Sequence, residues 1–233
     1  MAGLFLKQAP GSDEALQQLH GLLLKDILLL NGKSSIFQME RCTQRISESG
    51  GPKLDPAKML SEYQAVLEAT IQSRTERLRR AEGPADEFVV HGARALLEKL
   101  RARGLILIIL SGTVEHQVKQ ESKLLDLDRY FGAHIYGGTA NLAQSSKKAV
   151  IDRLLREEQI SGEHLLAFGD GPVEIQVTKE AGGLAVGVAS DEDNNGSGKM
   201  HPQKLPQLRE AGADLLIADY RDPDNLLRRL LGQ

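Results

Sequence analysis

An aspartate between two glycines follows an apolar run, and a glutamate comes four residues later. The stretch is "LLAFGDGPVE", with Asp170 and Glu174 as the two carboxylates. If residues 171–174 begin a helix, both carboxylates face one point. Like charges held that close repel unless a cation lies between them, and oxygen ligands that leave room for water suit Mg²⁺. The alternative is structural, with Asp170 capping the helix and Glu174 stabilising its first turn.

Two further groups could act on an anion. Ser111 and Gly112 follow the apolar run "LILIIL" and place a hydroxyl and backbone N–H groups ahead of a helix. Lys147 and Lys148 begin another helix, where a positive charge opposes the helix dipole. Taken singly, an ordinary turn and a solvated lysine explain these residues equally well.

The elements that position these groups alternate between strand and helix. Strands are predicted at residues 105–110, 133–137, 165–169, 184–188 and 214–219, and helices at 92–104, 115–127 and 147–160. This alternation predicts a Rossmann-like parallel sheet covered by helices on both faces. Right-handed crossovers bring the carboxyl ends of parallel strands to one edge, where ligands bind.

The first 83 or so residues have a different pattern. Apolar residues recur there at intervals of three and four, with Ser12 or Asp13 and Asp55 placed as helix caps. Glycine and proline at 50–53 and 82–87 break the pattern. We therefore expect an α/β protein with a helical region at 1–85 and a sheet-containing core at 86–233.

Composition narrows the classes of partner. The chain has 29 Lys and Arg against 32 Asp and Glu, a net charge of −3, and no long basic block that would bind nucleic acid. It has one cysteine, Cys42, and no run of 18 apolar residues, so a cytoplasmic protein without a membrane partner is expected. Residues 190–198 have the composition of a solvated loop. The oligomeric state is open.

Five of the six histidines form no recognisable ligand set, and each of them is expected at the surface or behind the site: His91, His116, His134, His164 and His201. Glu115 and His116 follow the "SGT" turn closely enough to touch a substrate.

Serine after one strand, lysine at a later helix and Gly-Asp-Gly after the next strand occur in this order in the haloacid dehalogenase-like (HAD) superfamily of phosphohydrolases. The chain resembles that superfamily from about residue 88 to the end, and "LNGKSSIFQM" resembles the helical cap of one of its branches. The resemblance implies a Mg²⁺-dependent phosphatase that acts on a small phosphorylated substrate.

The resemblance also implies residue roles. Ser111 and Gly112 would hold the transferring phosphoryl group, and Lys147, rather than Lys148, would offset its charge. Asp170 would bind Mg²⁺, and Glu174 stands where the motif often has a second aspartate. The helical region would close over the site as a cap.

One part of the HAD pattern is missing. HAD phosphatases begin with a central strand that ends in Asp-x-Asp-Gly-Thr, whose first aspartate attacks phosphorus, and this sequence has no such segment. Asp13 lies in a turn, Asp26 within an amphipathic helix, and Asp55 before a proline.

We therefore expect that the first central strand is missing and that the natural gene product starts upstream of Met1. In an alternative, residues 3–7 are drawn into the gap as a surrogate strand. A second alternative for function is a catalytically inactive Mg²⁺- and phosphate-binding protein. A dinucleotide-binding domain is disfavoured, since "GGLAVGVAS" lacks the glycine spacing.

Overall fold

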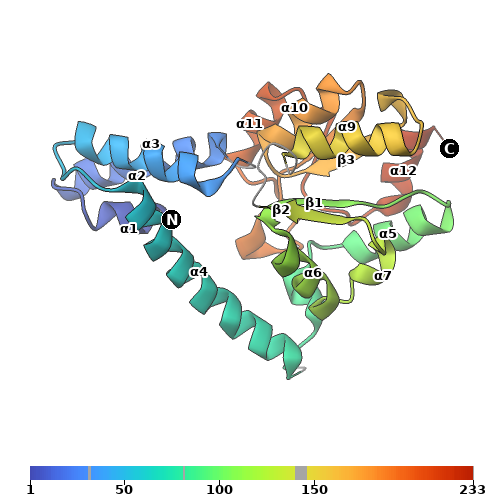
Figure 1. Ribbon diagram of the computed structural model, residues 1–233, viewed down its shortest axis with the longest axis horizontal. Helices are drawn as coiled ribbons and strands as arrows, with labels where there is room; N and C mark the ends of the chain where they lie inside the picture. Colours follow the sequence, from blue (N-terminus) through green and yellow to red (C-terminus); the bar gives the residue numbers. More distant parts are fainter. Residues whose placement is uncertain (31–32, 81, 140–145, 233) are drawn as a thin grey trace.

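The computed structural model describes residues 1–30, 33–80, 82–139 and 146–232. The chain has two parts: it is helical up to residue 79, and strands alternate with helices beyond it. The two parts lie side by side (Figure 1). Among the described residues, no helix has the length and apolar character needed to span a membrane.

Four helices make up the first part. They are α1 (Ala2–Leu6), α2 (Asp13–Leu29), α3 (Ser35–Glu48) and α4 (Pro56–Arg79). Two predicted caps are confirmed, because the side chains of Ser12 and Asp55 accept hydrogen bonds from the backbone N–H groups of Ala15 and Ala57. These helices share an apolar core, whose fully buried members are Phe5, Leu23, Met39, Cys42 and Ile46.

Residues 3–7 do not act as a surrogate strand. Residues 2–6 form α1, and Phe5 is fully buried in the core of the helical part. The alternative is therefore wrong, because the apolar residues that would have to enter the sheet are already used in packing α1 against α2 and α3.

The second part contains five strands among the described residues, together with the helices that connect them. In chain order its elements are η1 (Ala85–Phe88), α5 (Ala93–Ala102), β1 (Ile109–Val114), α6 (Glu115–Leu124), α7 (Asp128–Phe131), β2 (Ile135–Gly138), α9 (Lys147–Glu157), η2 (Gly162–His164), β3 (Leu166–Gly169), α10 (Pro172–Glu180), β4 (Leu184–Val188), η3 (Glu192–Asn194), α11 (Lys204–Glu210), β5 (Leu215–Ile217) and α12 (Pro223–Leu231).

All described strand pairs are parallel, as the sequence predicts. They form two groups, β1-β2 and β3-β4-β5, and not one continuous sheet. The HAD resemblance places the first central strand between the strands matched here by β1 and β3, and no described strand joins the two groups. That a further strand lies between the two groups stays a prediction.

The boundaries predicted for the first strand are wrong by four residues. The strand runs over 109–114 instead of 105–110, so Ser111 and Gly112 lie within β1 and not after it. The ladder begins where a neighbour exists, with Ile109 opposite Ile135. The earlier part of the apolar run has no described pairing partner, and Ile106 is 53% exposed.

Helices cover both faces of the β3-β4-β5 group. On one face, Leu215 and Ile217 of β5 pack against Leu96 and Leu227 of α5 and α12. On the other face, Leu216 packs with Ile175 and Leu208 of α10 and α11. The expected three-layer arrangement is therefore present in this group. The helical part touches the α/β part through α4 against α6 and α2 against α11.

Candidate active site at the end of strand β3

Asp170 follows the carboxyl end of β3 and does not cap the next helix. The N-cap of α10 is Gly171, and no side chain makes a capping hydrogen bond there. The capping alternative is thus wrong for Asp170, whose side chain is 54% exposed. The first glycine of the turn, Gly169, is needed for space, because a Cβ at this position would come 2.6 Å from the Cβ of Glu174.

Lys147 is the buried member of the lysine pair. It is the first residue of α9, where Ser146 supplies the cap, and it is only 9% exposed. Its ammonium group forms an ion pair with Oε1 of Glu174. Burial lowers the pKa of Lys147 to about 8, and the negative charge of Asp170 opposes this shift. Lys148 is exposed and lies 3.6 Å from Asp152.

Glu174 has one oxygen in contact with Lys147 and one without a partner. Oε2 of Glu174 is buried and makes no hydrogen bond. Such an orphaned oxygen is costly unless a cation or a donor reaches it, so the site fits a divalent cation held by carboxylates. Lys147 already balances the charge of Glu174, so the role of Glu174 as a metal ligand stays a prediction.

Asp170 and Glu174 are not part of a larger metal cluster in the described part of the chain. Within the described ranges, no group of three or more His, Cys, Asp or Glu side chains could hold a metal ion. Asp170 and Glu174 would then supply the protein ligands, with water or phosphate oxygens completing the shell, as Mg²⁺ tolerates.

Ser111 and Glu115 make local contacts. Oγ of Ser111 accepts a hydrogen bond of 3.1 Å from the N–H of Thr113. Glu115 begins α6, pairs with Lys119 at 2.5 Å and accepts a 3.4 Å bond from the N–H of Gly137. The structure therefore pairs Lys147 with Glu174, and the charge of Asp170 acts on Lys147, while the bonds described for Ser111 and Glu115 serve the β1 to α6 turn.

Sequence reasoning missed Lys204. This lysine is the first residue of α11, is 6% exposed, and places Nζ 3.9 Å from Oδ2 of Asp170. A signal existed, because a lysine at the start of a helix opposes the dipole in the same way as Lys147.

A groove lies between the helical part and the α/β part. Its volume is about 650 Å³, and α4, α6, residues 87–90 and residues 190–195 supply its walls. Glu192 lines the groove and also contacts Lys204, so the groove reaches the neighbourhood of Asp170. The apolar part of its lining comprises Leu67, Ile71, Leu78, Phe88, Val89, Val90, Leu124 and Leu125.

Comparisons with solved structures give the same fold over almost the whole chain. A conserved haloacid dehalogenase-like protein of unknown function from Agrobacterium tumefaciens is 19% identical, with a TM-score of 0.62 and coverage of 94% of this chain and 91% of that chain. A predicted phosphoglycolate phosphatase from Haemophilus somnus is 16% identical, with a TM-score of 0.59 and coverage of 97% and 89%.

A HAD family hydrolase from Deinococcus radiodurans, solved with bound phosphate and sodium, is 14% identical, with a TM-score of 0.56 and coverage of 99% and 90%. At these identities the likeness describes the fold. No curated protein sequence matches the chain.

A match to a family model identifies the family of this chain. The model described as haloacid dehalogenase-like hydrolase matches residues 57–182, which is more than half of the chain. The matched segment includes β1, the lysine at the start of α9 and the Gly-Asp-Gly turn after β3. The chain belongs to the haloacid dehalogenase-like hydrolase family.

Proposed function

We propose that this fold serves a Mg²⁺-dependent phosphatase that acts on a small phosphorylated metabolite. The observation that carries the proposal is the grouping of Lys147, Asp170 and Glu174 at the carboxyl end of β3. Carboxylates and a buried lysine at the ligand edge of a parallel sheet suit a cation and a phosphate together.

Each residue has a distinct part in the proposal. Asp170, with Glu174 beside it, holds Mg²⁺, and the bound ion supplies positive charge where the transferring phosphoryl group develops negative charge. Lys147 adds a second positive charge to the same group, and Ser111 and Gly112 donate hydrogen bonds to its oxygens. Because Lys147 is buried, its charge is screened less by water than a surface lysine would be.

The organic part of the substrate would lie in the groove beside α4. In this proposal, residues 1–85 act as the cap and residues 86–233 as the core, and the groove between α4 and α6 lies at their contact. A mixed apolar and charged lining favours a substrate with both kinds of surface.

Catalysis also needs a nucleophile. The HAD resemblance implies that an aspartate of an Asp-x-Asp turn would be this nucleophile, and residues 1–233 contain no such turn after an apolar strand. A second function, Mg²⁺ and phosphate binding without turnover, is favoured by the missing Asp-x-Asp-Gly-Thr segment and by the unfilled break between β1 and β3. Sequencing upstream of the Met1 codon tests for a nucleophile, because an in-frame apolar strand ending in Asp-x-Asp would favour the phosphatase over the binding protein.

Replacing Asp170 by Asn tests the metal site. Asparagine keeps the shape of the side chain but loses the charge that Mg²⁺ needs, so we expect calorimetry to show no Mg²⁺ binding to Asp170→Asn. Asp152→Asn is a matched control, since Asp152 is partly exposed and pairs with Lys148. Equal Mg²⁺ affinity of Asp170→Asn and the unmodified chain would contradict the assignment.

A phosphatase assay tests whether residues 1–233 contain a nucleophile of their own. Residues 1–233 are expected to bind Mg²⁺ and inorganic phosphate but not to turn over p-nitrophenyl phosphate. Turnover would show that another residue of the chain acts as nucleophile and would favour the enzyme over the binding protein.

A further inference from the structure

Lys204 lies at the site without being part of the HAD pattern identified in the sequence. Its side chain is 7% exposed, yet its ammonium group meets two carboxylates that are largely exposed, Asp170 at 3.9 Å and Glu192 in closer contact. A buried lysine is costly unless charged partners or a ligand compensate it. Lys204 therefore projects from the protein interior toward the open carboxyl end of β3.

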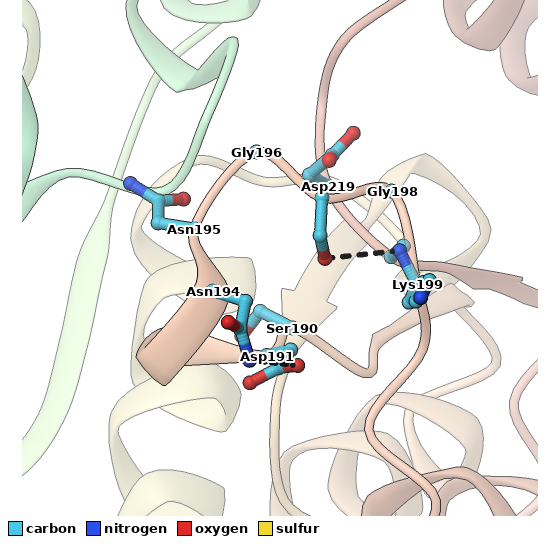
Figure 2. Close-up of a pocket in the computed structure, with 10 residues that line it drawn as sticks. Ser190, Asp191, Asn194, Asn195, Gly196, Gly198, Lys199 and Asp219 are labelled. Carbon is cyan, nitrogen blue, oxygen red and sulfur yellow. Dashed lines mark hydrogen bonds between the residues drawn. The ribbon is translucent and has the colours of Figure 1, made fainter.

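Glu192 has a second hydrogen-bond partner beside Lys204. Its Oε1 accepts a 2.9 Å hydrogen bond from Oγ of Ser190. The loop that carries it is tied to the segment before α5, where Asn195 donates to the carbonyl of Val89 at 2.9 Å and accepts from the N–H of His91 at 3.0 Å. Figure 2 shows Asn195 extending from this loop toward the neighbouring chain segment.

Two buried lysines thus approach the same aspartate from different helices. The charge of Asp170 acts on Lys147 of α9, and Lys204 of α11 lies 3.9 Å from Oδ2 of Asp170. The helix that carries Lys204 also contacts α2 of the helical part. Each lysine has its own glutamate as a further partner, Glu174 for Lys147 and Glu192 for Lys204.

We infer that Lys204 is a second positioning cation of the phosphate site: it holds the Asp170 carboxylate and tunes the charge of the site toward anions and away from cations. The inference rests on the proposed function of Asp170. It makes a prediction that a purely structural lysine would not make, namely effects of opposite sign on the two ligands. Removing a positive charge near a carboxylate favours a cation there and disfavours an anion.

The test measures both ligands on the full chain carrying Lys204→Met. We expect Mg²⁺ to bind about fivefold more tightly by calorimetry, and inorganic phosphate, without Mg²⁺, about fivefold more weakly from its shift of the thermal unfolding midpoint. Lys204→Arg keeps the charge and should restore both affinities to within about twofold. Lys148→Met removes an exposed lysine and should change neither.

Glu192→Gln supplies the mirror-image variant and is compatible with folding, since the Glu192 side chain is 62% exposed. The variant removes a negative charge, and Asp170 remains as the charged partner described for Lys204. Mg²⁺ should therefore bind more weakly and phosphate more tightly. This variant keeps the inference testable even if Lys204→Met does not fold.

The outcomes are separable. Changes of the same sign for both ligands in Lys204→Met, or no change in either, would overturn the role of Lys204, as would a failure of the unmodified chain to bind phosphate. If Asp170→Asn keeps its Mg²⁺ affinity, the proposed function fails instead, and the phosphate measurements still decide on Lys204.

Discussion

Lys147 and Glu174 form an ion pair that is nearly closed off from solvent. Their side chains are 9% and 17% exposed. Removing one partner leaves the other charge buried and unpaired, which costs about 3–5 kcal/mol in comparable pairs. The double variant Lys147→Met with Glu174→Gln should recover part of that loss, because no unpaired charge remains.

Urea unfolding of the two single variants and the double variant measures this pair. We expect Lys147→Met alone to lower the free energy of unfolding by about 3 kcal/mol. Lys148→Met, the neighbouring exposed lysine, should change it by less than about 0.5 kcal/mol. Equal stability of Lys147→Met and Lys148→Met would contradict the buried pair.

Cys42 should be inert in the folded protein. It is fully buried in the core of the helical part, and burial raises the pKa of its thiol to about 12, with the nearby Asp26 carboxylate adding to the shift. Because the thiolate is the reactive form, iodoacetamide at pH 8 should modify Cys42 only when the helices separate. Mass spectrometry should find no labelling in buffer and complete labelling in denaturing urea, and fast labelling in buffer would contradict this packing.

At the residue scale, the sequence predicts which residues lie at a strand end or a helix start better than it predicts which side chains those residues contact. Asp170 and Lys147 could be singled out because a strand end and a helix start are visible in the pattern of apolar residues. The contact of Lys147 with Glu174 could not, since it depends on how α9 and α10 pack. Lys204 was missed because its two partners are 12 and 34 residues away in the sequence.

The α2–α3 pair depends on one buried carboxylate. Asp26 on α2 accepts hydrogen bonds from Arg41 at 2.9 Å and from Arg45 at 2.6 Å, both on α3, and its side chain is 8% exposed. Burial alone would raise the pKa of Asp26, but the hydrogen bonds and charges of Arg45 and Arg41 outweigh it and lower the pKa below its usual value of 3.8.

This carboxylate predicts an acid-sensitive helix pair. A lowered pKa means that the stabilisation is complete above pH 3.8 and is lost as the pH falls through the folded-state value. Asp26→Asn should therefore lower the free energy of unfolding by about 3 kcal/mol at pH 7, where two arginines lose their counter-charge. The difference between the two proteins should be the same at pH 5 and shrink below pH 3.8. A constant difference down to pH 2 would contradict the pairing.

At the element scale, the spacing of apolar residues and the capping residues predict the helices well, whereas the bounds of a strand depend on the strand it pairs with. The ranges of α5, α6 and α9 follow from apolar residues spaced by three and four and from Gly104 after α5, which has a φ of +70°. The bounds of β1 did not follow, because the run 105–110 is uniformly apolar and does not reveal where β2 begins alongside it.

The whole molecule has one strand group that is well enclosed and another that is open. Strand β4 pairs on both sides, and its residues 185–188 are buried. Strand β1 pairs only with β2 among the described strands, and its residues are partly or largely exposed. Sequence alone predicts a doubly covered strand here, since six consecutive apolar residues normally belong to the middle of a parallel sheet.

Amide hydrogen exchange should reveal this asymmetry directly. Exchange reports the free energy of local opening, which falls where strands have an unpaired edge and little buried apolar surface. Each missing ladder hydrogen bond removes roughly 1 kcal/mol of protection. Peptides covering 109–114 should therefore exchange at least about tenfold faster than peptides covering 184–188, with α6 as an adjacent reference. Equal protection of β1 and β4 would mean that the edge of β1 facing β3 is closed in solution, and the proposal that this break accommodates a further strand would then have to be abandoned.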